Sequence, residues 1–289
     1  MGKVGILMGW NIAKIPKIAH FYWGATKLSW LRYMTVKTFS VCNPDWKIKF
    51  YIPSKLFSGG LKWEQERVSI NIDYLPEIYK LPNTEVITLD FDVLGIGDIP
   101  EVFRSDVLRL KLLGSDGGFW ADMDVITFKP FNEAYFNNPV YNKVDTFISY
   151  TYERNHYSIG YLLASVNNEF YNFLYNKSMQ CLLNSGDRQT FGVILWDRYF
   201  KRPEDIHNYF PDLKLFNIGL EASYYFIYTQ LPEMFEQNNV IKNNNSIALH
   251  WYGGHPISNK WESALDQSNW NLYENTITSL IKKALSHAN

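Results

Sequence analysis

The order of the first three predicted elements constrains the fold of this chain most strongly. Residues 17–23 (KIAHFYW) form a short apolar run after a proline, which predicts a buried strand. Residues 28–42 carry apolar side chains at helical spacing, and a turn at residues 43–45 (NPD) follows them. Residues 46–52 (WKIKFYI) alternate apolar and polar side chains, as a strand does. A strand, a helix and a strand in this order predict a parallel sheet with a right-handed crossover.

The remainder of the chain continues the alternation of strands and helices. Strands are predicted at residues 86–89, at 119–126 with an interruption, and at 146–150. Helices are predicted at 106–113 with Ser105 as the N-cap, at 168–183, at 191–200 and at 270–285. Neither an internal repeat nor a Ser-, Gly- or Pro-rich linker divides the sequence. We therefore expect an α/β fold in one domain over residues 1–289.

Composition excludes several classes of protein. Hydrophobic residues make up 46% and charged residues 20% of the 289 positions, which fits a folded, soluble chain. A net charge of −1 gives no attraction to nucleic acid or to anionic membranes. The two cysteines, Cys42 and Cys181, are too few for a disulfide scaffold and lack zinc-site spacing. The start of the chain has no signal-peptide pattern, and no run approaches the about 18 apolar residues of a membrane span. We expect a cytoplasmic protein without an integral membrane segment or a nucleic-acid partner.

The segment at residues 104–130 carries the most informative chemistry. Its helix ends near Gly117-Gly118, and a strand then presents Asp122 and Asp124 where it ends. Aspartates one residue apart can hold one hard cation, and Mg²⁺ or Mn²⁺ keeps positions open for phosphate oxygens. Such a cation relieves the repulsion between these acids and a diphosphate and stabilises charge on a leaving diphosphate.

A pair of aspartates is by itself a weak signal, because two solvated acids at a strand end give the same pattern. Asp90 and Asp92 form a second such pair, which we interpret as structural or peripheral. The pair within residues 104–130 differs because the preceding helix carries Asp106 and Arg109, followed by a glycine pair at compact spacing.

The pattern S-D-x-x-R…G-G-x-x-x-D-x-D resembles the signature of the DXD-containing glycosyltransferases. That group includes capsular-polysaccharide enzymes and yeast Och-type mannosyltransferases, and the catalytic domains of the large clostridial toxin glucosyltransferases look similar. The matched positions are Ser105, Asp106, Arg109, Gly117, Gly118, Asp122 and Asp124. Upstream, residues 15–24 (IPKIAHFYWG) resemble the opening strand of the same families, which often reads I-P-K-I-I-H-x-x-W. The matches cover about the first half of the chain.

The resemblance implies a GT-A fold, a single Rossmann-like nucleotide-binding α/β domain with a mixed sheet. Its donor-binding half would span about residues 1–130, and its acceptor and lid half about 131–289. The implied enzyme moves a hexose or N-acetylhexosamine from a nucleotide sugar to a glycan acceptor, with Mn²⁺ or Mg²⁺ and with retention of configuration. A UDP-sugar is favoured over a GDP-sugar. The lack of an anchor favours a bacterial, phage or viral origin, and the oligomeric state is not predicted.

The resemblance also implies roles for individual residues. Trp23 would stack on the nucleobase, or else belong to the core. Asp106 would bind ribose or sugar hydroxyls, and Arg109 would contact the sugar or its phosphate, or else form a helix ion pair with Asp106 or Asp116. Asp122 would lie near the ribose and sugar, and Asp124 would be the direct metal ligand. Asp106, Arg109, Asp122 and Asp124 form the predicted catalytic set.

Residues 248–261 (ALHWYGGHPISNKW) gather histidines, glycines and tryptophans, which predicts a lid over a bound nucleotide. His250 is a predicted ligand of the cation and the donor, and Trp261 is a predicted donor-site residue. The alternative is an aromatic loop packed on the surface. His20 is also a donor-site candidate, although a histidine in a buried strand more often serves the core. Residues 155–163 are where the family places the floor of the sugar pocket.

Two other classes of function compete with the transferase. One is a non-catalytic carbohydrate- or nucleotide-sugar-binding module with the same aromatic residues. The other is a nucleotidyltransferase or phosphohydrolase, but the sequence has no GxxxxGK[ST] phosphate loop. No general base or nucleophile stands out, so front-face attack and double displacement both stay open.

Overall fold

The computed structural model describes residues 15–59, 69–184, 192–219, 223–224, 231–238 and 246–288. The strands are β1 (Ile18–Tyr22), β2 (Lys47–Pro53), β3 (Thr84–Leu89), β4 (Gly118–Ala121), β5 (Val125–Thr127), β6 (Thr146–Thr151), β7 (His156–Ala164), β8 (Leu215–Asn217), β9 (Ser223–Tyr224) and β10 (Ala248–His250). The helices are α1 (Trp30–Cys42), α2 (Leu75–Ile78), α3 (Glu101–Ser115), α4 (Glu169–Asn184), α5 (Val193–Tyr199), α6 (Pro203–Tyr209), α7 (Leu231–Glu236), α8 (Pro256–Ala264) and α9 (Thr276–Leu285).

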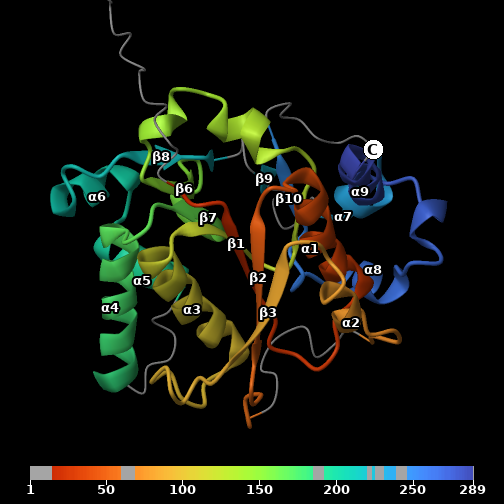
Figure 1. Ribbon diagram of the computed structural model, residues 1–289, viewed down its shortest axis with the longest axis horizontal. Helices are drawn as coiled ribbons and strands as arrows, with labels where there is room; N and C mark the ends of the chain where they lie inside the picture. The colour runs from red at the N-terminus through yellow and green to blue at the C-terminus, as the bar shows by residue number, and fades with distance from the viewer. Residues whose placement is uncertain are drawn as a thin grey trace, which may run out of the picture.

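A mixed seven-stranded sheet in the order β3-β2-β1-β4-β7-β6-β8 forms the centre of the fold (Figure 1). Strands β3, β2, β1 and β4 run parallel, whereas β7 runs antiparallel to β4 and β6. The predicted strand, helix and strand at the start of the chain are confirmed as β1, α1 and β2, with Ile18 opposite Lys47. A second sheet has the order β5-β10-β9. The predicted α/β class with a mixed sheet is confirmed.

Hydrophobic cores lie on both faces of the large sheet. In β1, Ala19 and Phe21 belong to the core that α1 and α9 help to form, whereas Tyr22 belongs to the core shared with α3, α4 and α5. Successive side chains of a strand point to opposite faces, so β1 contributes to both. Figure 1 shows α3 and α4 on one side of the sheet and α1 and α9 on the other. Helices on both faces are what parallel strands require.

The start of α3 differs from the prediction. The helix begins at Glu101 instead of residue 106, and its N-cap position is Pro100 instead of Ser105. Proline is compatible with a helix start because the N–H that it lacks would be unsatisfied there. Glu101 and Arg104 also form an ion pair of 2.9 Å within the first turn. Ser105 therefore lies inside the helix.

Other boundaries also changed. The interrupted strand predicted at residues 119–126 consists of β4 and β5, which belong to different sheets. The last helix begins at Thr276, because the Asn275 side chain accepts a hydrogen bond from Thr278 N (3.0 Å) and caps it there. Residue 191, the predicted start of another helix, lies outside the described residues. Among the helices that the structure describes, none combines the length and apolar character needed to cross a membrane.

The glycine pair between α3 and β4 sets the entry of β4 into the sheet. Gly117 and Gly118 have φ values of +66° and +93°, which other residues rarely adopt. A Cβ atom on Gly118 would lie only 2.3 Å from the carbonyl oxygen of Ile18 in β1. The pair thus lets β4 lie against β1 and brings the next turn to the carboxyl edge of the parallel strands.

Candidate active site

The turn between β4 and β5 carries Asp122 and Asp124 and connects the two sheets. Strand β5 runs antiparallel to β10, with Val125 opposite His250. Asp124 makes two hydrogen bonds to the segment that follows β10. Its carbonyl oxygen accepts from Trp251 N (2.9 Å), and its Oδ2 accepts from Gly253 N (2.8 Å). The C-terminal segment is thereby held beside the aspartates.

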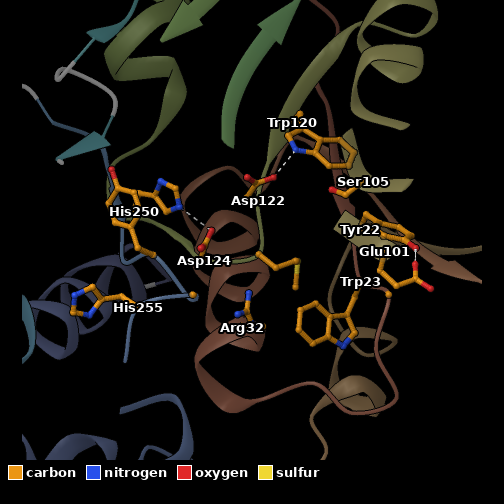
Figure 2. Close-up of a pocket in the computed structure, with 14 residues that line it drawn as sticks. Tyr22, Trp23, Arg32, Glu101, Ser105, Trp120, Asp122, Asp124, His250 and His255 are labelled. Atoms are coloured by element: carbon orange, nitrogen blue, oxygen red, sulfur yellow. Dashed lines mark hydrogen bonds and ion pairs between the residues drawn. The ribbon is translucent and has the colours of Figure 1, made fainter. Parts of the chain in front are cut away.

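A cavity of about 350 Å³ opens at this turn (Figure 2). Its lining residues are Tyr22, Trp23, Gly24, Arg32, Glu101, Ser105, Trp120, Asp122, Met123, Asp124, His250, Tyr252, Gly254 and His255. Four predicted site residues, Trp23, Asp122, Asp124 and His250, therefore meet at one cavity. They come from the end of β1, the β4–β5 turn and β10.

His250 and Asp124 form the closest charged contact in the cavity. His250 Nε2 lies 3.0 Å from Asp124 Oδ1, and the imidazole stacks on Tyr252 at 4.1 Å between ring centroids. Burial lowers the pKa of His250, but the Asp124 carboxylate outweighs that effect and the net pKa is raised. Burial raises the pKa of Asp124, but His250, Arg32 and the Gly253 amide together lower it by more than burial raises it. The net pKa is lowered, so the carboxyl stays ionised. In the parts of the chain that are described, no three His, Cys, Asp or Glu side chains are close enough to form a metal centre.

Two donors, from the side chains of Trp120 and Arg109, contact the carboxylate of Asp122. Its Oδ1 accepts from Trp120 Nε1 (3.0 Å) and lies 3.2 Å from Arg109 Nη2. Arg109 also pairs with Asp106 at 2.8 Å, one turn away on α3. Burial raises the pKa of Asp106 to about 6, with Arg109 opposing and Asp122 adding to that shift. Asp106 and Arg109 thus lie behind Asp122 instead of lining the cavity, and the predicted helix ion pair between them is present.

The structure does not bring His20 or Trp261 to the cavity. His20 is fully buried in β1, where its Nε2 lies 2.8 Å from Gly117 O and its Nδ1 lies 3.0 Å from the Tyr51 hydroxyl. Trp261 lies on α8, where it stacks on Phe235 at 5.9 Å. His20 lies in the protein interior and Trp261 is half-buried against the core, so both are outside the lining of this cavity.

Several lining residues were not predicted as site residues. The Tyr22 hydroxyl donates to Glu101, whose other oxygen accepts from Phe57 N and Arg104 Nη1. Tyr22 adjoins Trp23 in the sequence, so the end of β1 was a usable signal for it. Arg32 lies on a predicted helix whose pattern says nothing of what its polar side chains contact. Asp90, of the second aspartate pair, accepts from the backbone N–H groups of residues 92 and 93 and caps a turn.

A second cavity of about 240 Å³ adjoins the first and shares Asp122, His250 and Tyr252 with it. The β6–β7 hairpin supplies most of its remaining lining, including residues 156–160. This stretch coincides with the segment that the resemblance places at the floor of the sugar pocket.

The family described as "Capsular polysaccharide synthesis protein" matches residues 85–191, which hold α3, the glycine pair, Asp122 and Asp124. The match confirms the resemblance to the DXD-containing glycosyltransferases over that stretch, and a transferase of this group is the class that it supports. No curated protein matches the sequence.

Several solved structures overlap with this chain at low sequence identity. "PaToxG Glycosyltransferase" has a TM-score of 0.45 and 17% identity over 68% of this chain and 70% of that one. The galactosyltransferase LgtC, in complex with donor and acceptor sugar analogs, has a TM-score of 0.40 and 12% identity over 89% and 100%. The apo form of the glycosyltransferase GlyE of Streptococcus pneumoniae TIGR4 has a TM-score of 0.46 and 11% identity over 93% and 60%. The strand order of the large sheet of this chain agrees with the mixed sheet that the resemblance implies.

Proposed function

We propose that this protein is a metal-dependent glycosyltransferase that moves a hexose or N-acetylhexosamine from a nucleotide sugar to a glycan. The observation that carries the proposal is the meeting of Asp122, Asp124 and His250 with Trp23 at one cavity. That cavity lies beyond the carboxyl ends of the parallel strands, where open α/β sheets bind their ligands. The match of residues 85–191 to a capsular polysaccharide synthesis family supports the same class.

Asp124, Asp122 and His250 are the residues that would hold Mn²⁺ or Mg²⁺, although in this structure the three side chains are not close enough together to form a metal centre. Carboxylate oxygens and a neutral imidazole nitrogen suit such a cation, which supplies stabilisation of the charge on the departing diphosphate. His250 would serve as a ligand in its neutral form, so binding of the cation would be weaker at a pH where the ring is protonated. Arg109 and Trp120 keep Asp122 oriented toward the cavity.

The two cavities give the donor and the acceptor separate places. The nucleotide would occupy the larger cavity with its base near Trp23, a UDP-sugar being favoured, and the acceptor sugar the smaller one beside the β6–β7 hairpin. Both cavities take residues from the N-terminal and the C-terminal halves, so the two halves act together. In a front-face route to retention, the acceptor hydroxyl would attack the anomeric carbon on the face that the diphosphate leaves, and its proton would pass to the departing phosphate oxygen. Double displacement, which needs a carboxylate under the anomeric carbon, stays the alternative.

Donor hydrolysis tests this proposal. The purified chain is incubated with UDP-glucose, UDP-galactose, UDP-GlcNAc or GDP-mannose, with Mn²⁺ or with EDTA, and the released sugar is measured. We expect one donor to be hydrolysed, with activity lost in EDTA and reduced at least about 100-fold in Asp124→Ala. Asp92→Ala is the matched control, since Asp92 is an exposed member of the second aspartate pair, and it should retain full activity.

The remaining outcomes discriminate between the competing functions. A donor that binds without turnover, even with glycan acceptors present, would favour the non-catalytic module. Absence of Mn²⁺-dependent binding of every donor would contradict the proposed site itself.

A further inference from the structure

Arg32 of α1 is buried at the cavity in an unusual setting. Its side chain is only 3% exposed, and its guanidinium carbon lies 4.8 Å from the ring centroid of Trp23 and 5.1 Å from that of Trp251. Both distances are within the range of a cation–π contact, so two indole rings stabilise the charge of the guanidinium. Figure 2 shows Arg32 between Trp23 and Asp124, in the middle of the cavity.

Glu262 of α8 fixes the orientation of this guanidinium. Its Oε1 accepts from Arg32 Nε at 2.6 Å, and its Oε2 accepts from Nη2 at 3.3 Å. Ser29 Oγ donates to the same Oε1 at 2.7 Å, which positions the carboxylate in turn. The backbone of Gly253 packs against the other side, where a Cβ atom would lie 2.3 Å from Nη2. Arg32 therefore has little freedom to turn.

The third guanidinium nitrogen, Nη1, is not used by this arrangement. Within the part of the chain that the structure describes, it donates to no protein atom. The Arg32 side chain is only 3% exposed as a whole, so Nη1 is the charged donor that it has left for a ligand oxygen. Because Arg32 lines the cavity, a bound ligand can supply that oxygen.

The charges around the cavity indicate which ligand group this is. Three lining residues, Glu101, Asp122 and Asp124, are acids, whereas Arg32 is the single lysine or arginine among the described lining residues. A diphosphate brought to this cavity needs positive partners in addition to a cation at Asp124. Guanidinium groups bind phosphate oxygens particularly well.

We propose that Arg32 binds the diphosphate of the nucleotide donor through Nη1, and that Glu262 is a positioning residue that holds Arg32 for this contact. The inference rests on the proposed function, because it takes the larger cavity as the nucleotide site. Figure 2 shows Arg32 between Trp23, the candidate for stacking on the base, and Asp124, the candidate for binding the cation. A diphosphate that links a base at Trp23 to a cation at Asp124 would lie beside Arg32.

The test compares ligands that differ in the diphosphate alone. Uridine binding is measured by ligand-observed NMR titration and UDP binding by calorimetry, both with the diamagnetic Mg²⁺; guanosine and GDP replace them if wild type prefers that base. In Arg32→Gln we expect UDP affinity to fall about 10–100-fold and uridine affinity to change less than about 2-fold, since a charge-assisted hydrogen bond to phosphate is lost. Lys37→Gln, the same substitution five residues along α1 and outside the cavity lining, should leave both affinities unchanged.

Two further variants keep the test decisive if Arg32→Gln does not fold. Arg32→Lys keeps a charge but loses the fixed fork, and Glu262→Gln leaves Arg32 in place with weaker orientation. Both should lower the ratio of UDP to uridine affinity by at least about 3-fold, a readout that a merely structural role would not move. Equal ratios in wild type and these variants would overturn the role of Arg32. A wild-type protein that binds neither nucleotide would instead overturn the proposed function.

Discussion

At the scale of single residues, the burial of His20 favours a neutral imidazole. Its Nε2–H donates to Gly117 O at 2.8 Å, and in the neutral ring Nδ1 accepts from the Tyr51 hydroxyl at 3.0 Å. The net pKa of His20 is lowered from 6.5 to about 4: burial is the largest cause and the charge of Lys49 adds to it, whereas the hydrogen bond to Gly117 and the charge of Asp116 oppose the shift.

This depressed pKa makes a prediction about stability and pH. Because the folded state favours neutral His20, the neutral ring contributes to the free energy of unfolding above pH 6.5. This contribution is lost as the pH falls from 6.5 through 4. The loss amounts to about 3 kcal/mol over that range. We therefore expect the free energy of unfolding, measured with urea at pH 7, 6 and 5, to fall less with decreasing pH in His20→Gln than in wild type.

The control for this experiment is His207→Gln, since His207 is exposed on α6. Its unfolding should follow the wild-type pH dependence. If the free energy of unfolding falls equally with pH in wild type and His20→Gln, the structural role of His20 is contradicted. If His20→Gln binds the donor more weakly than wild type at pH 7, His20 belongs to the donor site.

The comparison of His20 with Trp23 shows what the sequence resolves at this scale. The opening motif places both residues in the donor site by resemblance. Trp23 follows the last residue of β1 and so reaches the carboxyl edge where the cavity opens, whereas His20 lies three residues earlier, inside the sheet. The motif identifies the strand, but the depth of each residue depends on where the strand ends, and that boundary is the least predictable part of a pattern.

At the scale of elements, the C-terminal segment depends on a pairing that no local pattern predicts. β10 joins β5 although more than 100 residues separate them, with Leu249 opposite Ile126. The sequence indicated a chemically rich segment at 248–261 but not its partner. Once β10 is paired, His250 faces Asp124, and the following turn and α8 bring Glu262 to Arg32. Trp261, from the same predicted lid, instead turns away to Phe235.

The close approach of this turn to α1 predicts the effect of a single methyl group. In Gly253→Ala, the added Cβ would lie 2.3 Å from Arg32 Nη2 and must displace the guanidinium or the turn. We expect a loss of about 1–3 kcal/mol in the free energy of unfolding, as for other overpacked sites. Chemical denaturation of wild type and the variant measures it.

A double variant identifies the cause of that loss. In an Arg32→Gln background the shorter side chain leaves room for the methyl group, so Gly253→Ala should cost at least about 1 kcal/mol less than in wild type. Additive effects of the two substitutions would show that the strain lies in the turn and not against Arg32.

At the scale of the whole molecule, the larger cavity collects residues from positions 22 to 255 along the chain. Strand β1, helices α1 and α3, the β4–β5 turn and the segment after β10 each contribute to it. The alternation of elements sufficed to predict the sheet and the edge at which the aspartates lie. The cavity itself arises from packing between distant segments, which is why Glu101 and Arg32 became visible as lining residues only in the structure.

A ligand that needs all these segments at once binds the folded chain and not the unfolded one, so it raises the stability of the whole fold. At about 100 times its dissociation constant, UDP with Mn²⁺ should add about 2.7 kcal/mol, which shifts the unfolding midpoint by about 4–5 °C in a chain of 289 residues. Thermal unfolding is followed with UDP and Mn²⁺ together, with each alone, and with UDP in EDTA. Because Asp122 and Asp124 repel a diphosphate unless a cation lies between them, the combined shift should exceed the sum of the separate shifts. An equal shift by UDP in EDTA would show that the nucleotide binds without the cation, and the assignment of Asp122, Asp124 and His250 as its ligands would then be wrong.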